Sequence, residues 1–166
     1  MKTFLRTLLY LALIVWLGAE FYFPAVAAVT FTSLMPDVHA AGTIVGALLR
    51  ILHGMGLVSG MVALAVLALA PALRVYHPRT VLAPMALLLI MIGCTVYSQF
   101  GIIPAMERDR IAAGGTIIPA HTENPNVADF NRLHNRSEFV EESILLMGMV
   151  TVVLLAWAES QKQPAS

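Results

Sequence analysis

Four polar side chains recur at helical spacing around the start of the last apolar segment. They are His134, Ser137, Glu138 and Glu141, at positions i, i+3, i+4 and i+7. This spacing places side chains on one face of an α-helix. His53 is followed at the same spacing by Gly56 and Gly60, and two helices pack closely over such glycines. The spacing therefore allows His53 and His134 to face each other at similar depth across a helical bundle.

Three kinds of chemistry fit these two histidines. In the first, they form a polar latch that fixes helix packing through hydrogen bonds to Glu20, Glu141, Gln99 or backbone carbonyls. In the second, His53 and His134 bind copper, zinc or haem iron, since imidazole suits all three metals and bundle cores build such sites from facing helices. In the third, they lie on a path for protons or a substrate. The sequence leaves all three interpretations open.

Motifs of known enzyme classes are missing from the sequence. It contains no Gly-rich phosphate loop, no Walker pattern and no paired nucleophile and base of the hydrolase kind. Ser137 lies at helical spacing from His134, but nothing near it supplies an oxyanion hole. We therefore expect a protein that is not an enzyme.

Glu20 is the most informative acidic residue, because it interrupts an otherwise apolar segment about one turn before Pro24. Ionisable side chains at membrane depth are costly and usually face the protein interior. Glu20 is therefore either a carboxylate at the membrane interface or a partner of His53, His134 or Arg50, and Arg50 itself could extend to the interface. The candidate ligand-binding or polar-network residues are Glu20, Arg50, His53, His134, Ser137 and Glu141.

The composition requires a membrane environment for these residues. Of 166 residues, 58% are hydrophobic and 12% are charged, and the mean hydropathy is +0.79. A soluble chain of this size could not bury so much apolar surface. The formal net charge of zero excludes the basic patch that nucleic-acid binding needs. The single cysteine, Cys94, excludes a disulfide framework and a multi-cysteine metal site.

Four apolar segments are long enough to cross a bilayer as helices. They cover about residues 4–29, 44–73, 81–103 and 139–158. We expect an all-α, four-transmembrane-helix bundle in a single membrane domain, with a long polar loop at about 104–138. A helix that starts near Asn126 or Asp129 is expected to run through His134 into the fourth segment. Ala25-Val26-Ala27 resembles a signal-peptidase site, but Glu20 and bulky residues precede it, so we expect the first segment to be retained.

The distribution of charge predicts the orientation. One side of the membrane would hold Lys2, Arg6, Arg74, Arg79 and Lys162, and the other Arg50, Arg108, Arg110, Arg132 and Arg136. The counts are equal, but the positive-inside rule gives more weight to short loops. It therefore favours a bacterial-type inner membrane protein with both termini in the cytoplasm.

The two halves of the sequence look alike. Pro24 stands 29 positions before His53 and Pro104 stands 30 positions before His134, and each histidine follows a leucine. Each half is thus a helical hairpin with a proline late in its first helix and a Leu-His pair near its second. This predicts a parallel repeat about an axis along the membrane normal.

Four short strings carry a resemblance to a known family. They are Phe31-Thr32-Ser33-Leu34, Leu52-His53, Pro104-Ala105-Met106-Glu107-Arg108 and Phe130-x-x-Leu133-His134-x-x-Ser137. In this order and spacing the chain resembles the transmembrane protein 205 family, a domain of unknown function, and is distantly similar to the copper-resistance protein D group. The resemblance implies a four-helix membrane protein linked to drug and metal tolerance, and the wider group includes haem-binding proteins. This chain differs at Glu141, where a small polar amide is expected.

The residues and the resemblance together predict a non-enzymatic membrane protein. It would handle a metal or a small toxic compound through a polar His/Glu pocket near the outer face. One alternative is an accessory or scaffold subunit of a larger membrane complex, and another is a haem-binding membrane protein. Haem, copper or zinc are the candidate cofactors. The expected partners are the lipid bilayer and a membrane protein or a second copy of the chain, with no nucleic acid.

Overall fold

The computed structural model describes residues 1–114 and 124–160. In this part the chain is all helical: α1 spans Lys2–Ser33, α2 Val38–Leu69, α3 Pro78–Tyr97, the π-helical turn η1 Ser98–Ile102, α4 Ile103–Ala112 and α5 Pro125–Ser160. The segments α3, η1 and α4 follow one another without a break, so they form one long rod.

Four of these helical rods are long and apolar enough to cross a membrane. They are Lys2–Ser33, Val38–Leu69, Pro78–Ala112 and Pro125–Ser160. Large apolar side chains such as Phe21, Phe100 and Phe139 are exposed on their outer faces. An exposed apolar surface of this kind suits contact with lipid rather than water. The predicted class, an all-α protein with four helices able to span a membrane, is confirmed.

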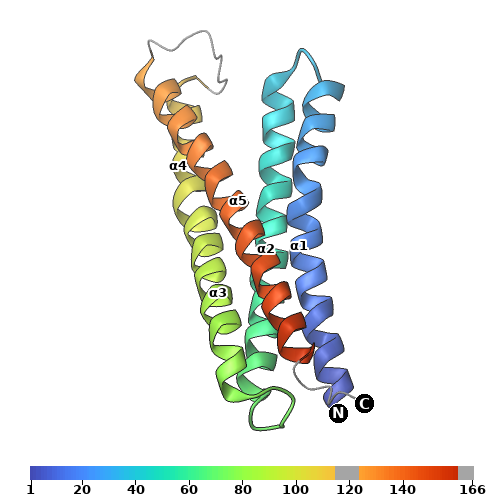
Figure 1. Ribbon diagram of the computed structural model, residues 1–166. Coiled ribbons are helices and arrows are strands. Elements are labelled where there is room, and N and C mark those ends of the chain that lie inside the picture. The colour runs from blue at the N-terminus through green and yellow to red at the C-terminus, as the bar shows by residue number, and fades with distance from the viewer. Residues whose placement is uncertain (115–123, 161–166) are drawn as a thin grey trace.

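The helices form two hairpins that pack against each other (Figure 1). One consists of α1 and α2, and the other of the α3–η1–α4 rod and α5. Helix α5 packs along α3 and also contacts α1, and α2 packs against α3. The start of α1, the end of α5 and the turn after α2 lie at one end of the molecule (Figure 1). We call this the terminal end.

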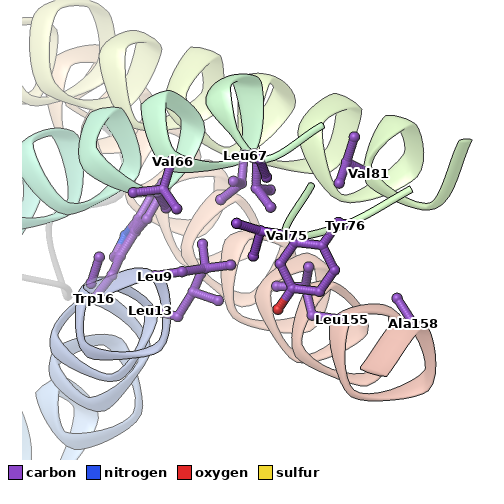
Figure 2. Packing of buried hydrophobic residues seen from close by; sticks show 14 of the residues in the cluster. Leu9, Leu13, Trp16, Val66, Leu67, Val75, Tyr76, Val81, Leu155 and Ala158 are labelled. Atoms are coloured by element: carbon purple, nitrogen blue, oxygen red, sulfur yellow. The ribbon is translucent and has the colours of Figure 1, made fainter. Parts of the chain in front are cut away.

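A continuous apolar core fills the half of the bundle near the terminal end. Every membrane-crossing rod contributes to it, with Leu9, Leu13 and Trp16 from α1, Val66 and Leu67 from α2, Leu88 and Met91 from α3, and Ile144 and Leu155 from α5. Figure 2 shows Trp16 between α1 and α2, and Leu9 and Leu13 directed towards the other helices. This core fixes how the helices are placed around the polar residues farther along the bundle.

The boundaries differ from the predicted ones mainly in the polar region. The predicted loop at 104–138 is wrong at residues 104–112, because α4 continues to Ala112. Charged pairs one turn apart stabilise α4 and the start of α5. The Arg110 and Glu107 side chains approach to 2.6 Å in α4, and those of Arg132 and Asp129 approach to 3.1 Å in α5. The centre of the predicted loop, 115–123, lies outside the described residues. The start of α5 agrees with the helix expected near Asn126.

Candidate functional site

His53 is fully buried at the point where α2 meets two other helical rods. Its Nδ1 atom lies 2.9 Å from Oε1 of Gln99 in η1. Its Nε2 atom lies 2.9 Å from Oε1 of Glu141 in α5. Both ring nitrogens therefore have a hydrogen-bond partner, and the two partners belong to different helices.

One carboxylate oxygen of Glu141 has hydrogen-bond partners, and the other has none among the described residues. Besides His53, Ser98 Oγ donates a hydrogen bond of 2.9 Å to Oε1. Oε2 is enclosed by protein and has no hydrogen-bond partner among the described residues. Since a buried polar atom without a partner is costly, Oε2 marks a place where a donor would be stabilising.

The π-helical turn η1 supplies two of the polar side chains, Ser98 and Gln99. Such turns are rare and are often found at functional sites. Gln99 was among the partners expected for a histidine latch. Ser98 was missed, although the polar pair Ser98-Gln99 stands out in an uncharged apolar segment.

Helix α1 contributes Glu20, which is buried and accepts a hydrogen bond from a residue one turn earlier in the same helix. Trp16 Nε1 donates a hydrogen bond of 3.2 Å to Glu20 Oε1. Glu20 is also close enough to Glu141 and His53 to interact with their charges. We call Trp16, Glu20, His53, Ser98, Gln99 and Glu141 the polar cluster. All four membrane-crossing rods contribute to it.

Two glycines let α2 approach α1 at this level. A Cβ atom added at Gly56 would lie 2.5 Å from Trp16 Nε1, and one at Gly60 would lie 2.5 Å from Trp16 Cζ3. A side chain at either position would thus displace the indole ring that holds Glu20. The glycines thus lie at a helix contact, but the neighbour that fills the space beside them is the Trp16 side chain of α1.

The structure does not bring His134 to His53. His134 is 53% exposed, its Nε2 lies 3.3 Å from Glu138 Oε1, and its ring stacks on Phe130. The prediction that the two histidines face each other is therefore wrong. Figure 1 shows the two hairpins diverging towards the end of the molecule at which α5 begins, and His134 lies in the early part of that helix.

The other two candidates have separate positions. Arg50 is exposed on α2 and interacts electrostatically with Glu107 rather than with Glu20. Ser137 is buried one turn before Glu141 on the same face of α5. Three of the six candidates, Glu20, His53 and Ser137, are thus buried, Glu141 is partly buried, and Arg50 and His134 are exposed.

The described residues do not bring together the two histidines that were expected to bind copper, zinc or haem iron. No group of three or more histidine, cysteine, aspartate or glutamate side chains among them is arranged to hold a metal. Both nitrogens of His53 are engaged in hydrogen bonds, and His134 lies on a different surface. A pair of imidazole ligands is therefore not available.

The contacts of His53 restrict where its protons can lie. With the Gln99 oxygen as acceptor, Nδ1 must carry a hydrogen and donate it. The contact between Nε2 and Glu141 Oε1 then needs one further proton, which belongs either to an imidazolium or to a carboxylic acid. Proton binding and release is the chemistry that this arrangement supports.

A second cluster of polar side chains joins the helices at the terminal end. The Tyr76 hydroxyl donates a hydrogen bond of 2.5 Å to Glu159 Oε1. The Arg6 guanidinium lies 5.7 Å from the centre of the Tyr76 ring, and its Nε lies 3.8 Å from Glu159 Oε1. Burial and the Glu159 carboxylate raise the pKa of the Tyr76 hydroxyl above its ordinary value. We call these three residues, which the sequence analysis missed, the terminal clasp.

Comparison with known proteins identifies the family but no function. No curated protein and no solved structure matches the chain. The family model described as a domain of unknown function, DUF4149, matches residues 11–111. This is more than half of the chain, and it includes Glu20, His53, Ser98 and Gln99 but not Glu141. The chain therefore belongs to the DUF4149 family, whose defining domain has no known function.

Proposed function

We propose that this chain is a non-enzymatic integral membrane protein that binds and releases protons at the polar cluster. The site serves to handle a small compound, in line with the tolerance role that the resemblance to the transmembrane protein 205 family implies. One observation carries the proposal. Nε2 of the fully buried His53 imidazole lies 2.9 Å from Glu141 Oε1, and the second carboxylate oxygen of Glu141 has no partner among the described residues.

The charges of the cluster support a bound proton. The charged groups that act on Glu20 are Glu141 and His53, and those that act on His53 are Glu141 and Glu20. Even with His53 positively charged, two ionised carboxylates would leave one uncompensated negative charge inside the membrane. Such a charge is expensive in an apolar medium. At least one of the two carboxyl groups therefore holds a proton at neutral pH.

Infrared spectroscopy tests this proposal directly. A protonated carboxyl group has a C=O stretching band that a carboxylate lacks. We expect this band at pH 7 in the purified protein, and we expect the double variant Glu20→Gln/Glu141→Gln to lose it. Glu138→Gln is the matched control, because Glu138 lies on α5 three residues before Glu141 but is 62% exposed. Absence of the band in the unchanged protein, or its persistence in the double variant, would refute the proposal.

A scaffold role is the second candidate, and one observation favours it. The polar cluster joins all four membrane-crossing rods through hydrogen bonds, as a structural latch would. In that case Glu141→Gln would lower stability without changing proton binding. Co-purification of a membrane-protein partner in mild detergent would support this role.

Three finer expectations stay proposals. We propose an inner membrane of bacterial type with both termini in the cytoplasm, one membrane domain, and a parallel repeat of two similar hairpins. The Leu-His pairs of the hairpins lie in different surroundings, since His53 is buried and His134 is exposed. A haem-binding role is not proposed, because the two histidines expected to hold the iron are in different surroundings.

A further inference from the structure

Glu141 Oε2 needs a hydrogen-bond donor that the described part of the chain does not supply. Its sister atom Oε1 already accepts from Ser98 and contacts His53 Nε2. The donors of Trp16 and of His53 Nδ1 are used by Glu20 and Gln99. A ligand that completes the cluster must therefore bring its own N–H or O–H group to Oε2.

The same ligand should carry one positive charge. The titratable groups around Glu141 are Glu20 from α1, His53 from α2 and the Cys94 thiol from α3, while η1 contributes the neutral side chains of Ser98 and Gln99. With one imidazolium and two carboxylates the cluster has a net charge of −1. A univalent cation neutralises that charge, whereas an anion would increase it.

The route to the cluster also restricts the ligand. The Glu141 side chain is 16% exposed, whereas that of His53 has no exposed surface. A ligand therefore reaches Glu141 before it reaches His53. Since Oε2 itself is enclosed, a compact donor head fits better than a bulky one.

We propose that Glu141 Oε2 binds a small ammonium group, which replaces the proton held by the two carboxyl groups of the cluster. This inference rests on the proton-binding function proposed above and names its ligand class. On binding, a carboxyl O–H bond breaks and its electron pair stays on oxygen. The proton leaves to water, and an N–H group of the ammonium donates to Oε2. The total charge of the cluster with its ligand is unchanged.

Methylammonium is the probe that tests this ligand class. Added to the purified protein at pH 7, it should remove the protonated-carboxyl band and release one proton per chain to a pH-indicator dye. Tetramethylammonium has the same charge but no N–H group, so it should do neither. The Glu138→Gln variant should respond as the unchanged protein does.

The outcomes separate the two proposals. If the carboxyl band is present but methylammonium does not change it, the ammonium site is refuted and the proton-binding function stands. If tetramethylammonium acts equally well, charge alone explains the effect and the N–H donor is refuted. If the band is absent from the start, both proposals fail.

The ammonium group could belong to a free amine or to a lipid headgroup. Nanodiscs of phosphatidylcholine alone, compared with nanodiscs that also contain phosphatidylethanolamine, separate these sources. Loss of the protonated-carboxyl band in the nanodiscs that contain phosphatidylethanolamine, without added amine, assigns the lipid headgroup as the source. If both kinds of nanodisc show the band at first and lose it only after methylammonium is added, the source is a free amine.

Discussion

Two glutamates three residues apart on α5 show how local surroundings decide the role of a side chain. Glu138 is exposed and pairs with His134 on its own helix. Glu141 faces the other helices, contacts His53 and accepts a hydrogen bond from Ser98. The same residue type is thus a surface ion pair at one position and a partly buried hydrogen-bond acceptor at the other.

The two histidines should respond very differently to the same substitution. His53→Gln removes one partner of the hydrogen bond to Glu141 and leaves a polar group inside the protein unsatisfied, which typically costs about 1–3 kcal/mol. His134→Gln changes an exposed side chain, for which the typical effect is within about 0.5 kcal/mol. Thermal unfolding of both variants in the same detergent measures the difference. Equal effects would mean that His53 is not held as the structure shows.

Helix–helix contacts position these residues, and the glycines of α2 are the clearest case. Gly56 and Gly60 lie directly against the Trp16 indole, whereas a Cβ atom at Gly54 would meet nothing within 4 Å. The three glycines lie on the same helix within two turns. Their surroundings, and not their helix propensities, should therefore decide the effect of a substitution.

Alanine substitutions test this contact. Gly56→Ala and Gly60→Ala would each press a methyl group against Trp16, and such overpacking costs about 1–3 kcal/mol. Gly54→Ala should be neutral or stabilising by up to about 1 kcal/mol, since alanine is the better helix former. Thermal unfolding checks the order, and the fluorescence of Trp16 should change in the first two variants alone. A destabilising Gly54→Ala would contradict the packing described.

The helical spacing of residues in the sequence predicted some members of the polar cluster and missed others. It indicated Gly56 and Gly60, which contact the Trp16 side chain, and it left Glu20 open between the membrane interface and the protein interior, where the structure buries it. It failed at His134, because a helix face can be covered at one level and uncovered two turns away. Ser98 was missed because the π-helical turn changes the period locally, and the sequence gives no sign of that change.

In the whole molecule, the terminal clasp and the apolar core lie on one side of the polar cluster. Tyr76, Glu159 and Arg6 join the turn after α2 to the last and first helices. These residues are far apart in the sequence, so no local pattern could predict their contact. The clasp stabilises the closed terminal end, towards which the two hairpins converge.

Removal of the Tyr76 hydroxyl should loosen this end. Tyr76→Phe loses a buried hydrogen bond to a charged group, worth about 1.5–3 kcal/mol, and Tyr22→Phe is an exposed control. The folded-state pKa of Tyr76 is raised above the unfolded value of about 10. The contribution of its hydroxyl to the free energy of unfolding is therefore complete below about pH 10, and it is lost as the pH rises through the folded-state pKa. Unfolding from pH 6 to pH 9 should thus show a constant difference between Tyr76→Phe and the unchanged protein. A difference that disappears at pH 8 would contradict the clasp.

Cysteine labelling tests the proposed orientation in intact cells. In a Cys94→Ala background, Ala112→Cys lies at the end of α4 and Arg79→Cys at the start of α3, at opposite ends of the rod. A membrane-impermeant maleimide should label Ala112→Cys from outside, and Arg79→Cys only after permeabilisation. The reverse pattern would place both termini outside.

Nitrogen-15 NMR of labelled histidine is the measurement that most directly tests the buried proton-binding pair. The N–H protons of His53, assigned by their loss in His53→Gln, should exchange slowly with water, and Glu141→Gln should shift the Nε2 signal. Those of His134 should exchange rapidly, because its side chain is 53% exposed. His53 protons that exchange as fast as those of His134, or that do not respond to Glu141→Gln, would contradict the proposed site.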